Sequence, residues 1–180
     1  MKRLLPGTEI GLPTHNDIGL ATAALYAGVE GGADLIDACV NGLGERAHIA
    51  PLAEVAAVLQ IYYGIDCGIR LEKMTELSRL VSDLMKWPMT DTMPFVGKTS
   101  FSHLVEVHYC VPDTEEGFWS YLCMKPHMFG NTRHNLLGHY SGPWAVRTKA
   151  KELGVTIAPG KEPAVVQKVR GEIRWRKRQL

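Results

Sequence analysis

The sequence lacks long apolar runs, paired cysteines and any marked excess of charge of one sign. No stretch approaches the roughly 20 apolar residues that a membrane-spanning helix needs, and the N-terminus has no apolar run of signal-peptide length. We therefore expect no membrane segment. A formal net charge of +1 is too small to predict a general nucleic-acid-binding surface.

The cysteines also exclude a disulfide or zinc framework. The four of them, Cys39, Cys67, Cys110 and Cys123, show no CxxC pair and no regular spacing. Free thiols in a reducing compartment are the simplest account, which predicts a cytoplasmic protein. There is no internal repeat. A length of 180 residues with 46% hydrophobic residues is enough for one substantial core and excludes a disordered chain.

The first seventy residues alternate short strands with helices. Residues 9–12 and the segment "ADLIDACV" are predicted strands, and 18–30 and 51–63 have apolar residues at helical spacing. This is the rhythm of a parallel β/α fold. Further helices are predicted at 70–86, 144–153 and 164–178.

Chemically capable side chains follow both predicted strands. His15, Asn16 and Asp17 follow the first, and Glu45 and Arg46 lie in the glycine-rich loop after the second. In parallel β/α folds, chemistry lies at the carboxyl ends of the strands. One histidine does not make a metal site, and Glu45 and Arg46 taken alone also fit a surface ion pair.

Two further segments hold candidate residues. His103 and His108 lie five residues apart, so their rings would not share a face if both were on one helix. Ser141 and Gly142 precede a predicted helix, a position that suits an N-cap or a contact with an anion.

The order of six segments resembles one enzyme family. They are LPTHNDIGLA, VNGLGERAHI, LSRLV, VGKTSFSHLVEVH, YLCMKPHMFGN and LGHYSG, and they cover nearly the whole chain. Their order and spacing are similar to those of the 2-isopropylmalate synthases and homocitrate synthases, acyl-CoA-dependent condensing enzymes on metal-binding TIM barrels. The resemblance implies an α/β fold: a partial TIM barrel with strands six to eight in residues 1–88, then a linker and mainly helical subdomain in 89–180.

The resemblance also implies roles for individual residues. His15 matches a metal ligand, and Glu45, His108 and Tyr121 match catalytic residues. The expected substrate-binding residues are Asn16, Asp17, Arg46 and Ser141. The implied cofactor is a divalent metal (Mg, Mn or Zn), and the implied substrates are acetyl-CoA and a 2-oxo acid, as in homocitrate, isopropylmalate or citrate synthesis.

Several positions depart from the family pattern. Pro13 stands where the family has its first metal-binding histidine, and His48 and Ile49 replace the Gly-Asn pair that follows G-E-R-A. His48 is a candidate substitute ligand. By the resemblance the chain starts at strand six, so strands one to five, with a metal-binding Asp on the first, would come from elsewhere. We therefore expect a homo-oligomer, or a hetero-oligomer with a chain that carries the N-terminal barrel half.

Three interpretations remain open from the sequence. The first is a split or partial condensing synthase. The second is a non-catalytic, degenerate paralogue that serves as a dimerisation or capping module of a full-length synthase, which the loss of the ligand at Pro13 favours. The third is a lyase of the same superfamily. The loop "GLGERAHIAPL" argues against it, because the comparable lyases carry cysteine in this glycine loop and the loop here has none.

Overall fold

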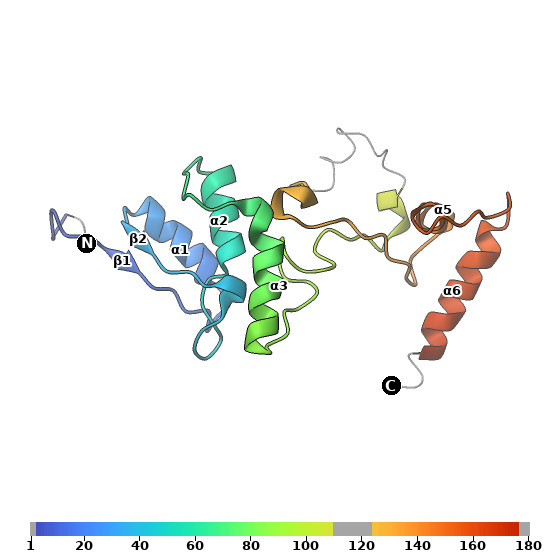
Figure 1. The fold of residues 1–180 in the computed structure, drawn as a ribbon, viewed down its shortest axis with the longest axis horizontal. Helices are drawn as coiled ribbons and strands as arrows, with labels where there is room; N and C mark the ends of the chain where they lie inside the picture. The colour runs from blue at the N-terminus through green and yellow to red at the C-terminus, as the bar shows by residue number, and fades with distance from the viewer. Residues whose placement is uncertain (1–2, 110–123, 177–180) are drawn as a thin grey trace. The chain divides into compact units, whose positions relative to one another are not determined.

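The structure is a computed structural model that describes residues 3–109 and 124–176 (Figure 1). It consists of two compact units. Unit 1 comprises Met1–Ser100 together with His127–Asn131, and unit 2 comprises Phe101–Pro126 and Thr132–Leu180. The predicted division after residue 88, between a barrel-derived part and a helical part, stays a prediction.

Unit 1 begins with a parallel β/α/β arrangement. Strand β1 (Gly11–Leu12) pairs in parallel with β2 (Leu35–Ile36), and helix α1 (Ala21–Glu30) connects them. The predicted parallel pairing is confirmed, but both strands are shorter than the predicted segments. Leu35 is exposed while Ile36 is half-buried, so only one face of the ribbon is covered. The described residues form this one two-stranded sheet, where three barrel strands were expected.

The core of unit 1 lies between α1 and α2 (Leu52–Ile61), which Figure 1 shows as neighbours. Leu25 of α1 packs with Val55 and Leu59 of α2, and Ile36 borders this cluster from the sheet. Buried alanines allow the close packing: Ala21 lies in α1, Ala53, Ala56 and Ala57 lie in α2, and Ala50 lies just before α2.

Helix α3 (Met74–Met85), preceded by a short 3-10 turn at Leu71–Lys73, confirms the amphipathic helix predicted at 70–86. Only part of its apolar face is covered: Met74 is buried, whereas Leu84 is 71% exposed. The Asn41 side-chain amide donates a hydrogen bond to the carbonyl oxygen of Ser78 (2.8 Å), which joins α3 to the loop after β2.

Residues 127–131 complete unit 1. The ring of Phe129 is fully buried and stacks on Phe95 with centroids 4.5 Å apart. Thr75 of α3 donates a buried hydrogen bond to the Phe129 carbonyl oxygen (2.7 Å). The Asn131 amide donates to the carbonyl oxygens of Phe95 and Gly97, each at 2.9 Å. These bonds fix the 95–100 loop against α3.

Unit 2 contains α5 (Pro143–Glu152) and α6 (Glu162–Arg176), close to the helices predicted at 144–153 and 164–178. The Arg147 guanidinium binds the nearly buried Glu162 carboxylate at 2.7 Å, which links the two helices. Among the described residues, no helix combines the length and apolar character needed to cross a membrane.

Candidate functional site

The polar segments that follow β1 and β2 lie side by side in unit 1. The Asn16 amide donates a hydrogen bond to the His48 carbonyl oxygen (2.8 Å), and His15 and Ile49 form an isolated antiparallel bridge. The two strands are parallel, so their carboxyl ends share one edge of the sheet. This confirms that the two groups of candidate residues are neighbours.

Arg46 and Asp17 form a two-pronged ion pair at this edge. Arg46 donates from Nε to Asp17 Oδ1 (3.0 Å) and from a terminal nitrogen to Oδ2 (2.9 Å). The hydrogen bond from Arg46 holds the pKa of Asp17 below its usual range, and the charges of Arg46 and His15 act in the same direction. Both side chains are about half exposed, at 55% and 46%, so the pair orients the two loops more than it stabilises the fold.

The side chain of Glu45 is 84% exposed, more than those of Arg46 and Asp17, and its carboxylate lies 3.7 Å from Arg46. The sequence suggested Glu45 as the partner of Arg46, but Asp17 is the closer and better aligned one. The side chain of Glu45 is therefore available to a ligand from the solvent side. Its catalytic role stays a prediction.

Asn16 and His15 differ in what holds them. The Asn16 side-chain oxygen accepts a hydrogen bond from the Ala21 amide (3.2 Å) in the first turn of α1, and this contact shapes the loop. His15 is exposed, within electrostatic reach of Asp17. The roles of Asn16 in substrate binding and of His15 in metal binding stay predictions.

The described residues do not make a divalent-metal site by themselves. In residues 3–109 and 124–176 no three His, Cys, Asp or Glu side chains are grouped so that they could hold an ion. Asp17 is bound to Arg46, and Nδ1 of His48 lies 3.2 Å from both the nitrogen and the oxygen of Gly44. The His48 ring also packs edge-on against Trp87, with centroids 5.9 Å apart.

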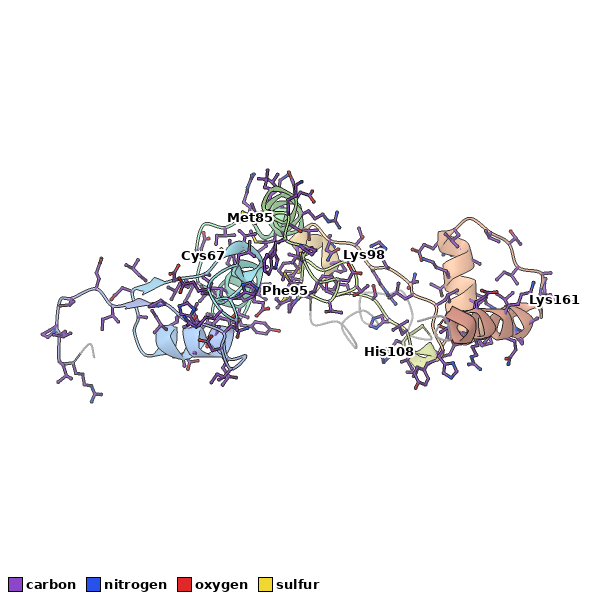
Figure 2. The ribbon with its side chains drawn as sticks, turned by 90° about the horizontal axis from the view of Figure 1, so that it is seen from below. Cys67, Met85, Phe95, Lys98, His108 and Lys161 are labelled. Carbon is purple, nitrogen blue, oxygen red and sulfur yellow. The ribbon has the colours of Figure 1, made fainter. Side chains whose placement is uncertain are left out.

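In unit 2 the two candidate histidines meet. The ring centroids of His103 and His108 are 5.0 Å apart in an edge-on contact, contrary to the separation expected for one helix. The reason is that the short 3-10 helix begins only at Glu106. His103 lies before this helix, so the two histidines are not on one helix. His108, labelled in Figure 2, therefore has an imidazole neighbour.

Glu106, which the sequence did not single out, holds the start of α5. Its carboxylate accepts hydrogen bonds from the backbone amides of Gly142 (2.7 Å), Trp144 (2.7 Å) and Ala145 (3.1 Å). These are amides that an α-helix leaves without an internal partner. Gly142 of the predicted Ser141-Gly142 pair is the N-cap residue of α5, but no local side chain caps the helix.

Ser141 is buried, at 1% exposed, and its side chain bonds to backbone groups. Its hydroxyl accepts a hydrogen bond from the Gly138 amide (2.8 Å) and donates a long one to the Leu104 carbonyl oxygen (3.4 Å). Its predicted contact with substrate stays a prediction. Tyr121, the remaining catalytic candidate, lies outside the described residues.

Comparisons with known proteins match the part of the chain that contains these motifs. A family model described as HMGL-like matches residues 1–81, which hold the whole strand-end region. The homocitrate synthase of Saccharolobus islandicus strain L.S.2.15 is 36% identical over 170 residues, 94% of this chain. Residues 1–81 of this chain belong to the HMGL-like family. The resemblance to condensing synthases inferred from the motifs is thereby confirmed.

Two further synthases show a similar level of identity to this chain. The homocitrate synthase of Saccharolobus solfataricus is 36% identical over 93% of the chain, and the (R)-citramalate synthase CimA of Methanocaldococcus jannaschii is 38% identical over 89%. The chain spans about a third of the length of these relatives, 36% of each homocitrate synthase and 32% of the citramalate synthase. The similarity therefore concerns one part of a larger enzyme.

Proposed function

We propose that this chain is the C-terminal part of an acyl-CoA-dependent condensing synthase, and that it acts with the barrel strands that its relatives carry outside the aligned region. The observation that carries the proposal is the ion pair between Asp17 and Arg46, which joins the two strand-end motifs at one edge of the sheet. The names of the relatives, homocitrate and citramalate synthase, support a 2-oxo acid as the acceptor.

The proposed reaction joins acetyl-CoA to a 2-oxo acid. A base removes a proton from the acetyl methyl group, the resulting carbon attacks the keto carbon, and the keto oxygen takes up a proton. Water then cleaves the thioester and releases the CoA thiol. Proton transfer of this kind suits an imidazole, because its pKa lies near neutrality. We assign it to His108, with Tyr121 assisting.

In the same proposal, the residues at the strand ends of unit 1 form part of the active site. His15 and Glu45 are the exposed groups there, and Arg46 and Asp17 hold the two loops in register. Since the described donors are too few for a divalent ion, such an ion belongs in this proposal only to the completed site, with ligands from outside these residues. A partial barrel, oligomerisation and a cytoplasmic location are parts of the same proposal.

The test measures thiol release from acetyl-CoA with a panel of 2-oxo acids and with Mg, Mn or Zn. The chain is assayed alone and co-expressed with the N-terminal half of a homocitrate synthase. We expect turnover in the co-expressed sample, reduced about 10²- to 10⁴-fold by His108→Ala. His139→Ala, an exposed histidine in the same unit, is the matched control. No thiol release under any combination would refute the proposal.

A second candidate, a non-catalytic capping module, is favoured by Pro13, which offers no donor where the family has a histidine. It predicts that the chain binds a full-length synthase without restoring any turnover to an N-terminal half. Sedimentation of the mixture, together with the thiol assay, distinguishes the two candidates.

A further inference from the structure

An open groove lies along helix α6, the last helix labelled in Figure 1. Its volume is about 300 Å³, at the lower end of the range for pockets that hold small molecules. Five residues line it, four of them on α6: Leu137, Lys168, Val169, Glu172 and Ile173. All five belong to unit 2, so the groove is a feature of that unit alone.

The apolar part of the groove is aliphatic. Val169 and Ile173 are four residues apart on α6, so their side chains share one face of the helix, and Leu137 borders the same space. All three are partly exposed. A ligand that covered them would remove apolar surface from water, which favours a ligand with an aliphatic body of its own.

Two opposite charges accompany this aliphatic surface. Lys168 and Glu172 both line the groove and both are exposed. Neither side chain forms an ion pair or a hydrogen bond within the described part of the chain. They start about 6 Å apart along the helix axis, at 1.5 Å per residue, and both are flexible enough to reach one small ligand. The groove therefore offers a partner for a carboxylate and a partner for an ammonium group.

We propose that this groove binds a free amino acid with a branched aliphatic side chain about the size of leucine. Lys168 binds the carboxylate of the amino acid, and Glu172 binds its ammonium group. The aliphatic side chain covers Val169 and Ile173. Exposed ion pairs contribute little, so the dissociation constant should lie in the millimolar range. The site goes beyond the proposed reaction and does not rest on it.

The experiment titrates the full chain with L-leucine at constant pH and ionic strength. The ¹³C-labelled methyl groups of Val169 and Ile173 report binding in NMR spectra. Three related compounds each lack one group: 4-methylpentanoate lacks the ammonium, 3-methylbutylamine the carboxylate, and glycine the aliphatic side chain. We expect saturation by leucine, binding about two- to fivefold weaker for the first two compounds, and no saturable shift with glycine.

Variants assign each charge to its partner. Lys168→Met and Glu172→Gln should each weaken leucine binding about two- to fivefold. Lys168→Met should not weaken binding of 3-methylbutylamine, which has no carboxylate, and Glu172→Gln should not weaken binding of 4-methylpentanoate, which has no ammonium. Lys161→Met, which removes an exposed charge just before α6, is the control and should leave leucine binding unchanged.

The proposal fails if leucine does not saturate, if glycine binds as tightly as leucine, or if either groove variant binds leucine as tightly as the wild type. Equal loss in the Lys161 control would overturn it too. Methyl shifts that follow protein concentration instead of leucine would show that a second copy of the chain occupies the groove, which also overturns it. Thiol release plays no part in the titration, so the condensing reaction succeeds or fails separately.

Discussion

Replacing Glu106 should open the start of α5. The variant Glu106→Ala removes the acceptor of three amides, two of which, those of Gly142 and Ala145, belong to buried residues. A buried amide without a partner costs about 1–3 kcal/mol, and the exposed amide of Trp144 can turn to water at little cost. Allowing for some entry of water, we expect a loss of about 2–4 kcal/mol in the opening free energy of this turn.

Hydrogen exchange measures this loss directly. At about 1.4 kcal/mol per factor of ten, the lower bound corresponds to roughly 30-fold faster exchange of the Gly142 and Ala145 amides. Glu106→Gln keeps one acceptor oxygen but no charge, so its effect should be smaller, about 1 kcal/mol. Glu152→Gln, which breaks only a surface pair with Lys149 at the other end of α5, is the control. Unchanged exchange in Glu106→Ala, or equal acceleration in the control, would refute the reasoning.

Three further predictions follow from the contacts. Arg46→Gln should raise the pKa of Asp17 toward its ordinary value in carboxyl NMR titrations, and an unchanged pKa would contradict this. In the wild type the ion pair stabilises the folded chain at neutral pH, and this contribution is lost as pH falls through the lowered pKa of Asp17. Arg133→Gln should raise the pKa of His103 in ring NMR titrations, and an unchanged pKa would contradict the assigned effect of the Arg133 charge. In the wild type the lowered pKa of His103 makes unit 2 less stable as pH falls, because the unfolded chain binds the proton at a higher pH than the folded chain. Phe129→Ala should destabilise unit 1 by about 3–5 kcal/mol in urea unfolding, against under about 1 kcal/mol for the exposed Leu84→Ala, and equal losses would contradict the assigned core.

The helices could be predicted because their pattern is local. Apolar residues at three- and four-residue spacing located α1, α2 and α3 to within a few residues. The strands were predicted too long, because a two-stranded ribbon covered on one face holds only two paired residues in each strand. Alternation in the sequence cannot reveal how many neighbours a strand has.

The site was predictable where chain order alone brings residues together. Both strand-end motifs had to meet at one edge of a parallel sheet, and they do. The particular partners were not predictable, because they depend on three-dimensional contacts over long sequence separations. Arg46 binds Asp17, 29 residues away, in preference to its neighbour Glu45. Glu106 reaches amides 36 to 39 residues away, and no local capping signal in the sequence marks it.

The two units use their carboxylates differently, and this determines what each can attract. In unit 1 Asp17 neutralises Arg46, so a cation approaching His15 would have to compete with a two-pronged guanidinium for that carboxylate. In unit 2 the Glu106 carboxylate is occupied instead by three backbone amides at the start of α5. Both carboxylates are therefore held by partners within their own unit, whereas Glu45 at the strand ends stays exposed to an approaching ligand.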